Sequence, residues 1–333
     1  MSTQTNLKKD QDLFIVLDGN AIMHRSYHAL PPLTTRDGEL VNAVFGFASI
    51  LMTILTQEEP TYILATFDTA APTFRHEMYT EYKAGRKKAD QEFYDQIPRI
   101  HELVKTFNIP ILKKDGVEAD DIIGTIVKYN EKNHPKVHNK IVTSDMDAMQ
   151  LVTNQTCVGT LHKGYKASTC FYPNEVFEKY LIYPDQVVDY KSLMGDPSDN
   201  IPGVRGIGKK GAQQLLSEFK TLDGIYENLD KIKGKKQEYL RDQKKEAYFS
   251  QQLATIKCDV ETEYNLEDCR SHDFDGEKVR ALLESLQFYS LIRRLGEWQK
   301  TNGLSQDDLN SVFEDQQPKK EKKTVNENQS ALF

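Results

Sequence analysis

The sequence has few cysteines, and they do not follow the spacing of a thiolate site. Cys157, Cys170, Cys258 and Cys269 are the four in 333 residues, and no two of them form a C-x-x-C pair. Thiolate metal sites usually need such pairs, and disulfide frameworks are typical of short secreted chains. We therefore expect neither, and interpret the cysteines as core or surface thiols.

Long apolar runs are missing as well. No stretch approaches the roughly 20 apolar residues that cross a bilayer, and 28% of the residues are charged. The polar segment 1–12 lacks the apolar stretch and the small-residue cleavage site of a secretory signal. We expect a cytoplasmic, monomeric protein without membrane contact.

Short apolar runs alternate with helical patterns in the first half of the chain. Runs rich in β-branched or aromatic residues predict strands at 13–17, 62–67, 109–112 and 140–143. Helical periodicity covers 43–55, 92–107 and 117–129. This alternation predicts an α/β fold with a parallel sheet over 13–172. Helices dominate over 173–304, and a polar segment, 305–333, predicts a disordered tail.

Carboxylates follow three of the predicted strands. Asp18, Asp68 and Asp145 stand at strand ends, where open α/β sheets bind their ligands. Six more acids lie in nearby short motifs, namely Glu118, Asp120, Asp121, Asp147, Asp196 and Asp199. A single such acid is often only a helix cap. Nine gathered carboxylates would repel one another without cations, and oxygen ligands select Mg²⁺ or Mn²⁺, so we predict two or more ions.

A net positive charge is also lacking, although nucleic-acid-binding proteins usually carry a basic footprint. The formal charge is −7, and without the nine carboxylates it becomes +2. The charge therefore does not exclude a polyanionic substrate that metal ions bridge to the acids.

A basic segment directly follows Asp68. It contains Arg75, Lys83, Arg86, Lys87 and Lys88, interleaved with Phe74, Tyr79 and Tyr82. Such a mixture suits binding of phosphates and stacking on the bases of a single strand. The alternative is a solvated helix face.

Three glycines, Gly203, Gly206 and Gly208, precede Lys209 and Lys210. The spacing resembles an ATP-binding phosphate loop, but Lys210 stands where Ser or Thr would ligate Mg²⁺, and no buried strand precedes it. A hairpin at 201–210 between two helices fits better, with free backbone N–H groups that bind a DNA phosphate. An ordinary loop is the alternative.

Taken together, the motifs over 13–298 closely resemble the 5′ nuclease domain of bacterial DNA polymerase I, a member of the flap endonuclease family. They are Asp18-Gly19-Asn20, Phe67-Asp68, Phe74-Arg75-His76-Glu77, Tyr82-Lys83-Ala84-Gly85-Arg86, Glu118-Ala119-Asp120-Asp121, Ser144-Asp145-Met146-Asp147 and Gly195-Asp196-Pro197-Ser198-Asp199-Asn200. The resemblance implies a parallel-sheet, PIN-like core, a helical arch at about 70–100, and a helix–three-turn–helix DNA-binding element. It also implies a two-metal 5′ to 3′ exonuclease and flap endonuclease in replication and repair, acting on 5′ flaps, nicks, free 5′ ends and RNA primers.

The resemblance further implies residue roles. Glu118, Asp120 and Asp145, with Asp18 and Asp68 farther away, would surround one metal position, and Asp147, Asp196 and Asp199 a second. Asp121 would be a direct ligand or a partner of ligands. Arg75, Lys83 and Arg86 would contact the scissile phosphate beside Tyr82, Lys87 and Lys88. Gly203, Gly206 and Gly208, with Lys209 and Lys210, would hold the duplex together with K⁺.

Two other functions are weaker. An aspartyl-phosphate phosphatase needs a second aspartate two residues after Asp18, where this chain has Asn20. A non-catalytic branched-DNA binder predicts missing metal ligands, and all nine acids are present. Because polymerase domains do not follow before Phe333, we expect a stand-alone nuclease, with a fragment of a polymerase as the alternative.

The last five residues, Gln329 to Phe333, look like the Gln-x-x-Leu-Phe peptide that docks bacterial replication proteins on the sliding clamp. Gln329, Leu332 and Phe333 would make the contacts, after a polar tether. A frayed chain end is the alternative interpretation.

Overall fold

The computed structural model describes residues 11–161 and 170–301. The expected disordered tail over 305–333 and the terminal peptide with Gln329, Leu332 and Phe333 lie outside the described residues.

The centre of the described fold is a six-stranded sheet with the order β3-β2-β1-β4-β5-β6. The strands are β1 (Asp12–Asp18), β2 (Tyr62–Thr66), β3 (Ile111–Leu112), β4 (Val137–Thr143), β5 (Thr156–Thr160) and β6 (Cys170–Phe171). All neighbours are parallel except β5 and β6, which are antiparallel. The predicted α/β fold with a parallel sheet is confirmed, and β5 with the antiparallel edge strand β6 extends it.

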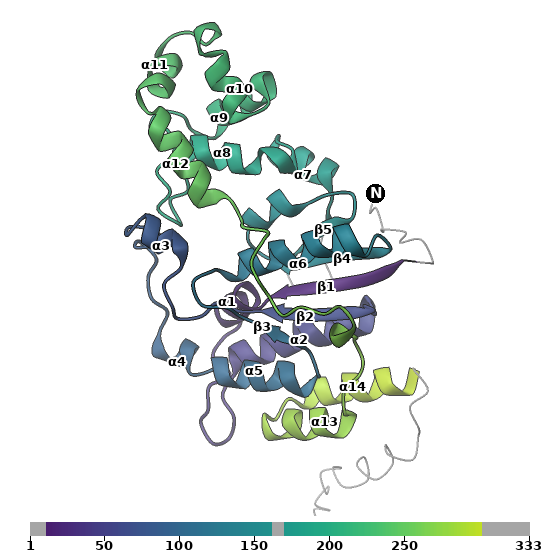
Figure 1. Cartoon of the computed structure of the whole chain (residues 1–333). Coiled ribbons are helices and arrows are strands. Elements are labelled where there is room, and N and C mark those ends of the chain that lie inside the picture. The colour runs from purple at the N-terminus through teal and green to yellow at the C-terminus, as the bar shows by residue number, and fades with distance from the viewer. Residues whose placement is uncertain (1–10, 162–169, 302–333) are drawn as a thin grey trace, which may run out of the picture.

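Helices cover both faces of the sheet (Figure 1). One face carries α1 (Gly19–Ala29), α2 (Asn42–Gln57) and α5 (Ile97–Thr106), and the other carries α6 (Ala119–Asn133). Along β1, Ile15 and Leu17 pack on the first side, and Phe14 and Val16 on the second. Two covered faces explain why β1 and β2 are nearly continuous apolar runs.

One predicted helix is divided in two. The segment expected to be helical over 92–107 forms α4 (Gln91–Tyr94) and α5, and α5 has Pro98 in its first turn. Proline lacks an N–H and has a fixed φ, so it fits a helix start better than a helix interior.

The strand order places a switch point next to β1. The chain moves outward to β2 and β3 on one side of β1, and returns to β4 on its other side. Ligands of open α/β sheets bind at the carboxyl ends of the strands beside such a point. Asp18 ends β1 and Asp145 follows β4, so both stand at this edge.

Helices dominate the described chain after β4. They are η1 (Asp147–Leu151), α7 (Pro173–Tyr180), η3 (Pro184–Gln186), α8 (Val187–Met194), α9 (Lys209–Phe219), α10 (Leu222–Glu227), η4 (Leu229–Lys231), α11 (Lys235–Asp242), α12 (Lys244–Ala254), η5 (Glu267–Cys269), α13 (Gly276–Ser285) and α14 (Tyr289–Thr301). Helices α9 to α11 form the end farthest from the sheet (Figure 1). The chain then returns, and α13 and α14 pack against α5 and α2.

One cysteine prediction is wrong. Cys157 of β5 and Cys170 of β6 form a disulfide, with a Cα–Cα distance of 6.0 Å. The antiparallel pairing of the two strands brings these positions together, and no local spacing announces such a pairing. Cys258 is half-buried and Cys269 is buried, and both are thiols as expected. None of the described helices has the length and apolar character needed to cross a bilayer.

Candidate metal centre

A cavity of about 510 Å³ opens at the carboxyl ends of the strands. Five of the nine predicted acids line it, namely Asp18, Asp68, Glu118, Asp120 and Asp145. Lys83, Arg86 and Lys87 line the same cavity. The fold therefore gathers acids from three strand ends and one helix start, and places cations beside them.

Both central strands fix Asp18. Its Oδ1 accepts a hydrogen bond from the backbone N–H of Ala21 at 2.9 Å, which caps α1. Its Oδ2 accepts one from the hydroxyl of Thr143, the last residue of β4, at 2.6 Å. The Thr143 hydroxyl oxygen also accepts the N–H of Asp145 at 3.0 Å. One threonine thus positions two acids at the switch point.

The start of α6 brings in the other acids of the cavity. The backbone N–H of Ala119 donates to Asp68 Oδ1 at 2.8 Å, so Asp68 contacts the first turn of that helix. Acids near a helix N-terminus are stabilised by its dipole. Glu118 and Asp120 enter the cavity from this same turn.

The carboxylates raise one another's pKa. Burial raises the pKa of Asp18 to about 6, with further contributions from Asp68 and Asp145. Burial, followed by repulsion from Asp18, Asp145 and Glu118, raises the pKa of Asp120 well above its ordinary value. The acids offer only carboxylate oxygens as ligands, and a nearby positive charge would stabilise their ionised forms. They therefore fit a hard divalent cation.

The raised pKa of Asp18 predicts how Asp18→Asn changes stability in EDTA. The folded pKa is about 6 against an ordinary 3.8, so the folded state binds this proton more tightly than the unfolded chain does. An ionised Asp18 therefore costs stability, on the order of 3 kcal/mol above pH 6, and the cost fades as the pH falls towards 4.

Asp18→Asn should therefore melt above the wild type at pH 7 in EDTA, and this advantage should vanish near pH 4. Added Mg²⁺ should raise the melting temperature of the wild type above that of the variant at pH 7, because only the wild type keeps the Asp18 carboxylate. Thermal melts at both pH values check this. An advantage that does not change with pH would contradict the assignment.

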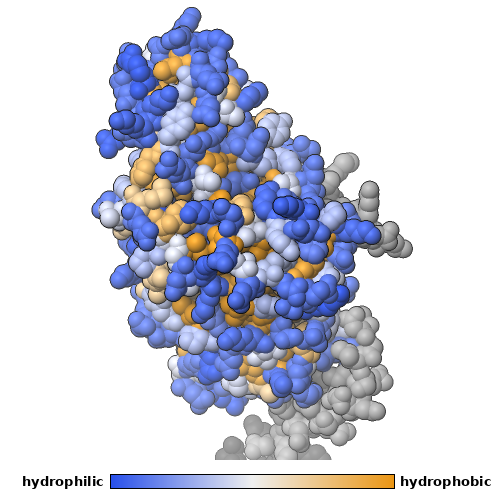
Figure 2. Space-filling view, in the orientation of Figure 1, coloured by the Kyte–Doolittle hydropathy of each residue, from blue (hydrophilic) through white to orange (hydrophobic). Residues whose placement is uncertain are grey.

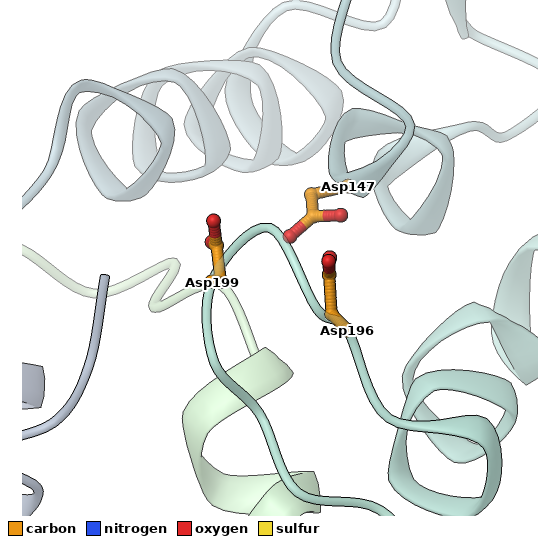
Figure 3. Close-up of side chains that lie close together, drawn as sticks. All are labelled: Asp147, Asp196 and Asp199. Atoms are coloured by element: carbon orange, nitrogen blue, oxygen red, sulfur yellow. The ribbon is translucent and has the colours of Figure 1, made fainter. Parts of the chain in front are cut away.

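A second acid group lies beside the first. Asp147 comes from the start of η1, whereas Asp196 and Asp199 come from the loop between α8 and α9. One carboxylate oxygen from each lies within 4.8 Å of the other two, and Figure 3 shows the three side chains converging. The structure thus brings together the acids that the family resemblance grouped as a second metal position.

Basic side chains contact both acid groups. Lys83 Nζ lies 2.5 Å from Glu118 Oε1, and Arg86 Nη2 contacts Asp199 Oδ1. The backbone N–H of Lys83 donates to Asp199 O at 3.0 Å, and Lys83 has a φ of 57°. This left-handed conformation costs a non-glycine residue about 1–2 kcal/mol. This strained conformation occurs at the residue whose side chain contacts the acids.

Arg75 does not have its predicted role, and it pairs with Asp121. Arg75, in α3 (Phe74–Met78), is buried, and its N–H groups donate to both oxygens of Asp121, to Glu118 and to the carbonyls of Leu253 and Thr255. No N–H is left for a substrate phosphate. Asp121 is fully buried in this pairing and does not line the cavity. Arg75 is therefore a positioning residue for Glu118.

Tyr82 does not fit its predicted contact with DNA. Its side chain is buried, and its hydroxyl lies 3.2 Å from both Glu118 Oε2 and Asp199 Oδ2. A buried ring cannot stack on a base. Lys87 and Lys88 are exposed, and Lys87 lines the cavity.

The glycine hairpin is partly closed by internal hydrogen bonds. The N–H of Gly203 donates to Ser250 Oγ, and that of Val204 to Leu193 O. The N–H groups of Ile201, Arg205 and Ile207 also donate hydrogen bonds, so the expectation of free N–H groups is wrong for these five residues. Gly206, Gly208, Lys209 and Lys210 are exposed, with Gly208 directly before α9.

Sequence reasoning missed three residues of the site. Asn20 and His24 project from α1 into the cavity. Lys191 of α8 lies 2.6 Å from Asp196 Oδ2 and also contacts Asp147. A lysine between apolar residues of a buried helix is a signal that the sequence does contain.

Family models match most of the chain. The model described as 5′-3′ exonuclease, N-terminal resolvase-like domain, matches residues 13–181. The model described as 5′-3′ exonuclease, C-terminal SAM fold, matches residues 182–277.

Curated relatives are longer proteins. The chain is 41% identical to DNA polymerase I of Caldicellulosiruptor bescii over 284 residues, which are 85% of this chain and 33% of that protein. It is 42% identical to DNA polymerase I of Bacillus subtilis over 284 residues, which are 85% of this chain and 32% of that protein. The chain therefore spans about a third of the length of these relatives.

Solved structures share the fold at low identity. A bacteriophage T5 5′-exonuclease with bound zinc has a TM-score of 0.61 and 20% identity, covering 86% of this chain and 98% of that one. The catalytic core of Rad2 with a DNA substrate has a TM-score of 0.57 and 14% identity, covering 88% and 94%. The matched family models, together with acids gathered at the switch point, show that the chain belongs to the 5′-3′ exonuclease family.

Proposed function

We propose that the chain hydrolyses phosphodiester bonds near the 5′ ends of DNA, at flaps, nicks and free ends, with divalent cations as cofactors. The observation that carries this is the cavity in which five acids face Lys83, Arg86 and Lys87. Two structural neighbours support it, namely the T5 5′-exonuclease with bound zinc and the catalytic core of Rad2 in complex with a DNA substrate.

Two sets of residues would hold the cations. Asp18, Asp68, Glu118, Asp120 and Asp145 form the first set, and Asp147, Asp196 and Asp199 the second. Bound Mg²⁺ or Mn²⁺ would supply Lewis acidity and a nucleophilic water at neutral pH. The chain contributes the geometry, because Thr143 fixes Asp18 and Asp145, and Arg75 fixes Glu118.

Lys83 and Arg86 would bind the phosphate that reacts. Both reach the cavity from segment 79–86, which lies against the loop that carries Asp199. Positive charge held there stabilises the negative charge that develops in the transition state. No protein nucleophile is required for this reaction.

The hairpin would hold the duplex arm of the substrate. Gly206, Gly208, Lys209 and Lys210 are exposed at the start of α9, where backbone N–H groups and lysines suit a phosphate. Hydrophilic residues cover much of the α9 to α11 end on the face seen in Figure 2. We extend the proposal to K⁺ at this hairpin and to RNA primers as substrates, on the family resemblance alone. A cytoplasmic, monomeric state remains a prediction.

Gly208→Ala tests the hairpin. A Cβ at Gly208 meets nothing within 4 Å, so the fold should tolerate the alanine. A phosphate bound close to this backbone would clash with the added methyl group. We expect affinity for a nicked duplex to fall about fivefold, as for the loss of one hydrogen bond, with an unchanged single-turnover rate.

Gly211→Ala is the matched control, because Gly211 lies three residues farther along, within α9, and its Cβ would make only an ordinary contact. Equal affinity of Gly208→Ala and wild type, measured by fluorescence anisotropy, would place the duplex elsewhere.

The decisive test of function uses labelled 5′-flap, nicked and single-stranded DNA, with Mg²⁺ or with EDTA. We expect cleavage only with Mg²⁺, with a 3′ hydroxyl on the released fragment and a 5′ phosphate on the strand left behind, and faster cleavage of the flap than of the single strand. A flap that is bound but stays uncut in both Mg²⁺ and Mn²⁺ would favour the non-catalytic DNA binder. A chimeric substrate with an RNA 5′ segment tests the primer proposal.

We also propose that Gln329, Leu332 and Phe333 dock on a bacterial sliding clamp. Burial of Leu332 and Phe333 in a clamp pocket would contribute about 1.5–3 kcal/mol each, and tethering raises the local concentration of nuclease. Deleting 329–333 should leave cleavage of free flaps unchanged and abolish stimulation by a loaded clamp. Equal heats of clamp binding for the full-length and truncated chains would refute this.

A further inference from the structure

Lys191 is a buried lysine inside the second acid group. It lies in α8, and its side chain is 6% exposed. Its Nζ contacts Asp147 Oδ1 and lies 2.6 Å from Asp196 Oδ2. Two of the three converging acids therefore share one ammonium group that the chain itself supplies.

The charge of Lys191 acts on the acids around it. Burial alone would raise the pKa of Asp196, but Lys191 and Ser198 outweigh burial and lower that pKa to about 2. Burial raises the pKa of Asp145, and Lys191 is the first of the cations that oppose this rise.

Lys191 is less exposed than Lys83 and Arg86, the cations of the cavity. The Lys83 and Arg86 side chains are 19% and 50% exposed and lie in the turns of segment 79–86. Both line the cavity, where a substrate phosphate would be within their reach. Lys191 lies in a helix that packs into the core through Val187 and Leu193, so its ammonium group is largely shielded from solvent.

We propose that Lys191 is a resident counter-ion of the second acid group. It holds Asp147 and Asp196 in place in the metal-free protein, and it must share these carboxylates when a divalent cation binds. The second cation therefore binds more weakly than the first, and the positive charge of Lys191 causes this difference in affinity. This inference rests on the proposed function, because it takes the same acids as metal ligands.

Lys191→Met tests the counter-ion, because methionine keeps much of the side-chain volume and removes the charge. In EDTA the variant should melt below the wild type, because Asp147 and Asp196 then repel each other without compensation. Saturating Mn²⁺ should remove more than half of that deficit. Electron paramagnetic resonance titration should show the weaker Mn²⁺ binding tightened on the order of 10-fold, because a nearby positive charge is gone.

Lys140→Met is the matched control. Lys140 is also a buried lysine, on β4, with its Nζ 2.6 and 2.7 Å from the two carboxylate oxygens of Glu58. Its melting deficit should be the same in EDTA and in Mn²⁺. If Lys191→Met behaves in the same way, with unchanged Mn²⁺ affinity, Lys191 only fills space and the inference fails.

A double variant keeps the test decisive if Lys191→Met does not fold in EDTA. Lys191→Met combined with Asp196→Asn removes one charge of each sign, so it should regain folding if Lys191 acts by charge. Failure to regain folding would overturn the inference. Wild-type protein that binds no Mn²⁺ would instead refute the proposed function, so the two failures are distinguishable.

Discussion

Asp120→Asn is expected to abolish cleavage of a 5′-flap substrate while flap binding stays nearly intact. Asp120 lines the cavity, and its carboxylate is repelled by Asp18, Asp145 and Glu118. Replacing it removes a ligand where the cation would stabilise the transition state. Such stabilisation is worth several kcal/mol, so we expect a loss of at least about 1000-fold in the single-turnover rate.

Asp145→Asn should have the same effect. The carbonyl of asparagine can still accept the N–H of Asp147, as Asp145 Oδ1 does at 2.9 Å, so the local fold is kept. Asp115→Asn is the control, because Asp115 is exposed just before α6 and does not line the cavity. Quenched-flow cleavage and anisotropy measure rate and binding separately. Either cavity variant cutting within about tenfold of the wild-type rate would refute the metal assignment.

Lys83→Ala and Arg86→Ala are expected to slow the cleavage step much more than they weaken binding. Both side chains line the cavity, and each contacts an acid that would hold a cation. A charge that acts on the reacting phosphate contributes mainly in the transition state, where one such group is typically worth about 10²–10³ in rate.

Lys88→Ala is the matched control, because Lys88 is exposed in the same segment but does not line the cavity. It should reduce binding slightly and leave the single-turnover rate at saturating enzyme unchanged. Normal rates for Lys83→Ala and Arg86→Ala under those conditions would contradict their role at the phosphate.

The strands and the acids at their ends could be predicted from the sequence, because the signals are local. Apolar runs such as 13–17 and 62–67 form β1 and β2 close to the expected limits. Asp18 and Asp145 could be placed at one edge because carboxyl ends of parallel strands lie together. The order of the motifs predicted the family that the family models identify.

Only the tertiary structure decided which charges pair. Arg75 is 46 residues from Asp121 and 178 from Leu253, and it contacts both. Tyr82 is buried by the same arrangement, although its local sequence is typical of an exposed basic segment. Cys157 and Cys170 meet only because β5 and β6 pair.

Lys191 shows the physical reason for this division. The neighbouring residues in the sequence indicate that Lys191 lies in a largely apolar helix. They do not indicate which groups compensate its buried charge. Burying an ammonium group is unfavourable unless carboxylates surround it, and those of Asp147 and Asp196 come from two different segments of the chain. Periodicity and strand ends are determined within a few residues, whereas charge pairing in a buried site depends on contacts between distant segments.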